Sequence, residues 1–508
     1  MNNIQETDKD ELLASDPTLC MFEQAREYAL QYDYLQQQVQ LTTGTQQDLY
    51  VALMMSSCVQ CCCSLFCAEK IASISSLPSD ESTMAAYTNR YLLMHVKSSI
   101  FENYLLLRSK KNKKGKTIWD RFTRAINNFG TPDLINRLSI LDTSFNAFHS
   151  DHIDVDFRNN TYHYGLHNSH EYYEQVKNIT SDEPILLEAE EFTRLMLDTI
   201  SLASDLEEYI CTTHNHTLPS QPLPALTTLE QEHKEMESLF TPETVTFFEK
   251  LVDATLRHQS ESNQMFKATD AFKTEYDKLP EQIDGISVKP SMEYEHQLAQ
   301  QTIQGYMYVY VATLDVLTTI LAYHHAPTFG QKLMLIHRIH ITVAGIMERV
   351  YTKDNTTNQL KDSIWKTIKE EIDNADKYEM DYGELEHNLD EIHTKVLSGV
   401  ERHILVHYFD DGKPNVTQFI NLITTIRPQV EVGKGISFLI IMQQLQNCIF
   451  NYLQYKTQIF EKVRIDNLAI INQNIKNIED SIAQCPNPEM RHFLKEMFDR
   501  ARGVVNEL

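Results

Sequence analysis

The stretch FTRLMLDTISLASDL, residues 192–206, predicts both a helix and a duplication. Its apolar residues recur every three or four positions, as they do in a helix with one buried face. They are Phe192, Leu195, Met196, Leu202, Ala203 and Leu206. The positions 246 residues later (438 − 192) carry the same periodicity: Phe438, Ile441, Met442, Cys448, Ile449 and Tyr452. One helical stripe is therefore present twice in the chain.

Three further matches extend the repeat, which is best sought before local detail. The only two tryptophans lie in Thr117-Ile118-Trp119 and Ser363-Ile364-Trp365, again 246 residues apart (365 − 119). Ile100-Phe101-Glu102 matches Ile346-Met347-Glu348 at the same offset. A looser match joins the stripe that starts at Val51 to the one that starts at Met307, an offset of 256 that implies an insertion in the second copy.

The composition predicts an all-α protein. Only 14 Gly and 15 Pro occur in 508 residues, and the apolar stripes have the helical period. We expect helices over residues 21–40, 46–73, 84–107, 117–128, 133–150, 184–211, 229–276, 293–325, 330–352, 358–377, 383–401 and 433–457.

The predicted organisation is two tandem copies of one bundle, packed against each other as an intramolecular pseudo-dimer. Its parts are a polar tail (1–18), a first helical domain (19–211), a proline-containing linker with an acidic helix (212–292), a second helical domain (293–457) and a C-terminal helical extension (458–508).

The net charge of −26 disfavours nonspecific nucleic-acid binding over the whole surface. Basic residues nevertheless gather at 108–124, where a solvated loop and a phosphate-tracking edge are the two interpretations. The second would make RNA-binding residues of Lys110, Lys111, Lys113 and Lys114.

Residues 49–68 are uncharged and as long as a membrane span, but they contain Ser56, Ser57, Gln60 and Ser64, and the repeat counterpart carries Asp315. We therefore expect no membrane association and a cytoplasmic protein without a signal peptide. The cysteines at 58, 61 and 62 fall on the apolar stripe, which favours buried core thiols over a zinc or redox site.

Two Arg-x4-His motifs are the candidate functional residues. Arg158-Asn159 precedes His163, and Arg402-His403 precedes His407, 244 residues later (402 − 158). A third match, from Arg90 to His95, lies in a predicted helix and has no counterpart in the repeat. A guanidinium binds phosphoryl groups through a fork of donors, and an imidazole moves protons near neutral pH. Two facing motifs would supply two Arg and two His for metal-independent cleavage beside a ribose 2′-hydroxyl.

At these residues the chain resembles the HEPN superfamily of helical bundles, whose signature is Arg, a polar residue, and His four to six positions after the Arg. The resemblance implies an endoribonuclease with a composite site and no cofactor or metal. Arg158 and Arg402 would bind the scissile phosphate, His163 and His407 would transfer protons, and Asn159 and His403 would support them. It also implies an RNA substrate and a role in prokaryotic antiphage defence or as a toxin, with a regulatory protein or antitoxin as partner and a homo-oligomer as one possible assembly.

Two alternatives remain. One is a non-catalytic all-α scaffold, such as a subunit of a defence complex, in which Arg158 and Arg402 pair with bundle carboxylates. The other is a helical subunit that binds a nucleotide without turning it over. Glu102 and Glu348, at matching positions, are either partners of motif residues or ordinary exposed glutamates.

Overall fold

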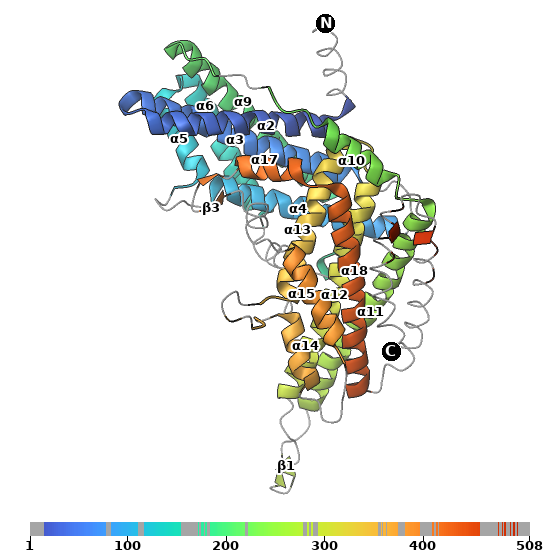
Figure 1. Cartoon of the computed structure of the whole chain (residues 1–508). Helices are drawn as coiled ribbons and strands as arrows, with labels where there is room; N and C mark the ends of the chain where they lie inside the picture. Colours follow the sequence, from blue (N-terminus) through green and yellow to red (C-terminus); the bar gives the residue numbers. More distant parts are fainter. Residues whose placement is uncertain are drawn as a thin grey trace.

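Two long apolar helices, α3 (Gly44–Ser75) and α12 (Glu293–His325), form the centres of two helical bundles in the computed structural model (Figure 1). The structure describes residues 15–77, 83–109, 116–153, 183–218, 222–277, 293–353, 363–373, 381–396 and 416–457, with short pieces at 171, 174–176, 178–179, 282–283, 286–287, 357, 359–361, 409–410 and 413–414, and single residues between 476 and 495. The described elements of regular structure are helices, apart from two-residue strands and one isolated bridge, so the predicted all-α class is confirmed.

The first bundle surrounds α3, which packs against most of its other helices. The other helices of this bundle are α2 (Pro17–Leu41), α4 (Thr83–Arg108), α5 (Ile118–Phe129), α6 (Pro132–His152) and α9 (Glu183–His214).

The second bundle surrounds α12 in the same way. It contains α11 (Pro242–Asp277), α13 (Phe329–Val350), α14 (Ile364–Asp373), α15 (Gly383–Val396) and α18 (Pro428–Thr457), with α10 (Thr227–Glu237) beside α13 and α18. Two antiparallel hairpins complete the elements: β1 (Gln282–Ile283) with β2 (Ile286–Ser287), and β3 (Phe409–Asp410) with β4 (Lys413–Pro414), which leads into α17 (Val416–Thr425).

The helices pair alike in the two bundles. α3 packs on α2, α4, α5 and α9, and α12 packs on α11, α13, α14 and α18. α6 lies against α9, and α15 lies against α18. The two tryptophans are both buried at the second position of a short helix, α5 or α14. A hydroxyl side chain caps each of these helices, because Thr117 accepts from the amide of Asp120 and Ser363 from the amide of Lys366.

Each bundle lends apolar side chains to the core of the other. The first core, built on α2, α3 and α9, also contains Leu333 and Met334 of α13 and three residues of α17: Phe419, Ile420 and Ile423. The second core, built on α12, α13 and α18, also contains Val176 and three residues of α4: Tyr91, Leu92 and Met94. Figure 1 accordingly shows α17, in orange, lying among the blue helices of the first bundle.

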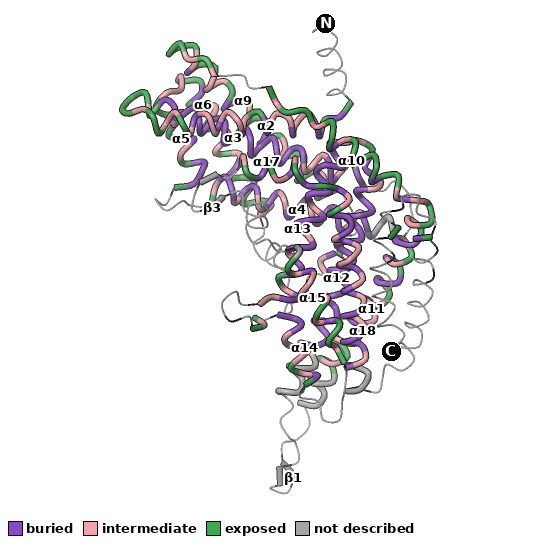
Figure 2. The backbone as a smooth tube through the Cα atoms, viewed as in Figure 1, coloured by how far each residue is buried: buried purple, intermediate pink, exposed green. Residues whose placement is uncertain are grey.

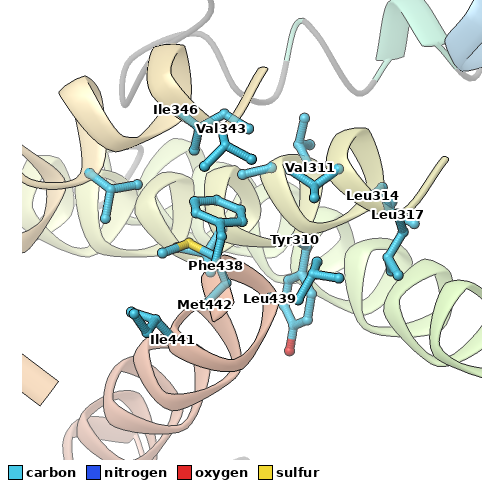
Figure 3. Close-up of a cluster of buried hydrophobic side chains, with 14 of the residues drawn as sticks. Tyr310, Val311, Leu314, Leu317, Val343, Ile346, Phe438, Leu439, Ile441 and Met442 are labelled. Atoms are coloured by element: carbon cyan, nitrogen blue, oxygen red, sulfur yellow. The ribbon is translucent and has the colours of Figure 1, made fainter. Parts of the chain in front are cut away.

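Buried positions continue along α12 and α13, so the interior is not interrupted where the bundles meet (Figure 2). Within the second core, Phe438 and Met442 of α18 lie close to Val343 and Ile346 of α13 (Figure 3). Burial of apolar surface of this kind is the main favourable term in folding. The two bundles are therefore expected to stabilise one another.

One sequence expectation differs from the structure. The helix predicted over 229–276 is interrupted between α10 and α11, because Thr241 caps a new helix that begins at Pro242. Within the range 212–292, predicted as a linker with an acidic helix, α11 packs against α12 and places Phe247, Phe248 and Val252 in the second core. The C-terminal extension lies largely outside the described residues.

The prediction of core thiols is confirmed, because Cys58, Cys61, Cys62, Cys63 and Cys67 are all buried in the first core. Burial raises the pKa of Cys67 to about 12 and holds that of Cys61 well above its ordinary value, so these thiols stay protonated at neutral pH.

Candidate functional site

The predicted site residues lie outside the described part of the chain. This holds for both motifs and for the four lysines: Arg158, Asn159, His163, Arg402, His403, His407, Lys110, Lys111, Lys113 and Lys114. The structure therefore gives no distance between any two of these residues. It does describe the chain on either side of each motif.

After the first motif, the chain contacts the second bundle. The Glu174 carboxylate accepts hydrogen bonds from Asn263 Nδ2 at 2.8 Å and from Lys267 Nζ at 3.0 Å, both on α11. Val176, two residues after Glu174 in the chain, is fully buried in the second core. The preceding described helix, α6, belongs to the first bundle.

After the second motif, the chain contacts the first bundle. The β3–β4 hairpin begins two residues beyond His407 and leads into α17. The Thr417 hydroxyl donates to the Ala29 carbonyl oxygen of α2 at 3.2 Å, and Phe419 is fully buried in the first core. Burial raises the pKa of the nearby Asp33 carboxyl on α2, and a hydrogen bond with Thr417 opposes that rise.

Within the first bundle, an ion pair joins the half-buried Lys97 to the buried Glu188. Lys97 Nζ of α4 lies 3.3 Å from Glu188 Oε2 at the start of α9. Burial raises the pKa of Glu188, and the positive charge of Lys97 acts against that rise. A little further along α9, Glu191 lies 3.3 Å from His152, the last residue of α6 before the first motif.

The second bundle carries a buried carboxylate near the start of α18. Glu431 accepts from His340 Nδ1 of α13 at 2.8 Å and from Lys434 Nζ at 2.8 Å. Burial alone would raise the pKa of Glu431, but the hydrogen bond from His340 and the adjacent positive charges outweigh it, so the pKa is lowered.

Two other histidines at the junction are held neutral. His95 of α4 lies 3.8 Å from Asp315 Oδ1 in the middle of α12. Burial, and then the charge of Arg338, hold the pKa of His95 well below its ordinary value. His337 of α13 packs edge-on to Phe419 of α17, with ring centroids 5.0 Å apart, and burial lowers its pKa to about 3. These rings are suited to packing rather than to carrying a proton at neutral pH.

Arg108, the first residue of the basic run, has a structural role. Arg108 bonds Asp142 at 2.7 Å, and its guanidinium lies 4.9 Å from the centre of the Trp119 ring. Trp119 Nε1 donates to the same carboxylate at 2.9 Å. Arg108 therefore ties α4 to α5 and α6 and is not presented to a nucleic acid.

The described residues contain no group of three or more His, Cys, Asp or Glu placed to hold a metal ion. Two described helices, α3 and the 300–325 part of α12, are long and apolar enough to cross a membrane. In both, the apolar window is almost wholly buried inside the structure, by 94% and 100% of its residues, as in the central helix of a bundle.

Comparison with known proteins finds no family model, no curated protein and no solved structure that matches this chain.

The part of the site that sequence reasoning missed is the crossing of α17 and of residues 174–176 to the opposite bundle. The apolar positions 419, 420 and 423 are a signal for a short amphipathic helix after Pro414, but periodicity alone does not say which core receives it.

Proposed function

We propose that this chain is a tandem HEPN-like endoribonuclease, in which two copies of one bundle form a pseudo-dimer around a single composite site. The observation that supports this most directly is the reciprocal crossing after the two motifs. The chain that follows each Arg-x4-His motif packs on the other bundle, so each motif is flanked by segments of both bundles. A shared site at the junction needs that arrangement.

The matching helix pairs support the duplication. In each bundle the central apolar helix packs on the helix that precedes it in the sequence, α2 or α11. Each bundle also has a short helix with a capped first turn that contains Trp, and each ends with a long helix. In sequence order the first motif follows α6 and the second follows α15, which supports equivalent positions for the two motifs. A binding function without catalysis needs no such pair.

The chemistry proposed is transesterification. One histidine takes the proton of the ribose 2′-hydroxyl, whose oxygen attacks the adjacent phosphorus. The two arginines stabilise the additional negative charge of the crowded phosphorane. The other histidine protonates the departing 5′-oxygen, so the products carry a 2′,3′-cyclic phosphate and a 5′-hydroxyl. His163 and His407 are the proposed proton carriers, and Arg158 and Arg402 the proposed phosphate ligands.

The biological setting proposed is cytoplasmic, in prokaryotic antiphage defence or as a toxin, with a protein partner that controls cleavage. The net negative charge of the chain opposes RNA binding over the whole surface, so the proposal requires that RNA is attracted locally, at the site.

The test is cleavage of a mixed RNA set in the presence of EDTA, resolved on a gel. The wild type is compared with a quadruple variant in which Arg158, His163, Arg402 and His407 are all alanine. We expect cleavage by the wild type alone, with 2′,3′-cyclic phosphate ends. Equal cleavage by both proteins would count against the proposal. So would a wild type that cuts no RNA in vitro and whose overexpression does not slow cell growth.

A further inference from the structure

The two crossing segments are anchored at matching places. Glu174 binds Asn263 and Lys267 of α11, and Thr417 binds the Ala29 carbonyl of α2. Each segment therefore bonds to the helix that precedes the central helix of the opposite bundle. We call α2 and α11 the outer helices, and each of them receives the segment that arrives from the other bundle.

The anchors are polar, although the residues next to them are apolar and buried. Val176 and Phe419 supply the burial, two residues after Glu174 and Thr417 respectively. Apolar contact alone is not directional and tolerates sliding. A carboxylate held by two donors, and a hydroxyl bound to a main-chain carbonyl, fix the position and rotation of each segment.

We infer that Glu174 and Thr417 are positioning residues for the two motifs, each fixing the segment that follows its motif on the outer helix of the opposite bundle. This inference rests on the proposed function, because a positioning role needs a reaction to position for. The structural part, that these contacts order the crossing segments, stands independently of catalysis.

The first test exchanges the charges of the Glu174–Lys267 pair. The variants are Glu174→Lys, Lys267→Glu and the double variant, with Lys250→Glu as a control at an exposed position on the same helix. The Lys267 side chain is 56% exposed, so the pair adds little to global stability and the melting temperature should move by about 2 °C or less. We expect each single variant to lower kcat by about 10- to 100-fold with KM nearly unchanged, and the double variant to recover most of it.

The second test removes the Thr417 hydroxyl at constant shape. Thr417→Val deletes the donor to the Ala29 carbonyl, and Thr417→Ser retains it. We expect Val to lower kcat and Ser to remain close to the wild type.

A readout that does not depend on cleavage separates this inference from the proposed function. The amides of Asn178 and Ile179 donate to the carbonyls of Glu174 and Val176, at 2.9 Å and 3.3 Å, and their hydrogen exchange reports order in the first crossing segment. We expect faster exchange in Lys267→Glu and recovery in the double variant. If the wild type fails to cut RNA but exchange responds in this way, the function is wrong and the anchoring stands. Unchanged exchange with wild-type kcat in the single variants would overturn the inference.

Discussion

The carboxylate of Asp16 joins the first turns of two helices from opposite bundles: one oxygen accepts from the Leu19 amide of α2 at 3.0 Å, and the other from the Gly330 amide of α13 at 2.7 Å. Asp16 is buried, and the N-termini of both helices carry partial positive charge toward it. A single side chain therefore satisfies amides at the starts of two helices.

Replacement of Asp16 should destabilise the protein. Asp16→Ala leaves two buried amides without this acceptor, and we expect a loss of about 1–3 kcal/mol in the free energy of unfolding. Asp16→Asn retains one carbonyl oxygen and should lose less. Urea unfolding of both variants measures the difference, and an alanine variant as stable as the wild type would contradict the role assigned to Asp16.

The close approach at Gly330 should not tolerate a methyl group. A Cβ there would lie 2.4 Å from the Leu19 nitrogen and 2.8 Å from Asp16 Oδ1. We expect Gly330→Ala to destabilise by about 1–3 kcal/mol. Gly345, on the same helix, has nothing within 4 Å of its added Cβ. Gly345→Ala is the matched control and should stabilise by up to about 1 kcal/mol, because alanine favours a helix. Thermal melting of the two variants should move in opposite directions.

The pH dependence of stability should differ between two buried carboxylates, Glu431 and Glu188. The pKa of Glu431 is lowered below its ordinary 4.5, so its contribution is present above that value and is lost as the pH falls through the folded pKa. We expect Glu431→Gln to destabilise at pH 7 by about 1–3 kcal/mol and to approach the wild type in acid.

Glu188 provides the opposite sign. Burial raises its pKa, so its contribution is largest below the ordinary value and falls as the pH rises through the folded pKa. The stability of the wild type relative to Glu188→Gln should therefore increase on acidification, whereas relative to Glu431→Gln it should decrease. Parallel curves from denaturant unfolding between pH 7 and pH 4 would refute this assignment.

A composite site predicts strongly non-additive loss of cleavage. Arg158→Ala or His407→Ala alone should reduce the cleavage rate about as much as the quadruple alanine variant, because the motifs act as one unit. Arg90→Lys, in the third Arg-x4-His match within α4, is the control and should leave the rate unchanged. Cleavage at the parental rate by a folded His407→Ala variant would rule out a shared site.

Phe419 should be a large contributor to the first core although it comes from the second half of the sequence. We expect Phe419→Ala to cost about 3–5 kcal/mol, as for other fully buried aromatic side chains. Leu197→Ala, at a site 43% exposed on α9, should change stability by less than about 0.5 kcal/mol. Denaturant unfolding of the two variants measures the contrast, and similar midpoints would mean that α17 is dispensable to the core.

Periodicity predicts most helices of both bundles, but α17 lies outside every predicted range. The stripes of α9 and α18 and the capped turns before Trp119 and Trp365 are local signals, because a helix of period 3.6 buries one face wherever it packs. The partner of that face is not a local property. This explains why the destination of α17 could not be predicted from Phe419 and its neighbours.

Charge runs were less informative than apolar stripes. The run 108–124 gave no indication that Arg108 lies over Trp119 and bonds Asp142, because the ring and the carboxylate come from helices that follow in the sequence. The break before α11 was visible in Thr241-Pro242, a helix-start signal within an otherwise continuous acidic pattern. The roles of the two Arg-x4-His motifs stay predictions.

The exchange of α17 and Val176 means that neither half of this chain is complete alone. A fragment ending before α11 would contain the first core without Leu333, Met334 and the three buried residues of α17, and the remaining fragment would lack the side chains that α4 and Val176 supply. Such fragments would each carry a cavity that only the other can fill. Division of the gene into two independently folding proteins is therefore closed to this architecture, whereas reassociation of co-expressed halves remains open.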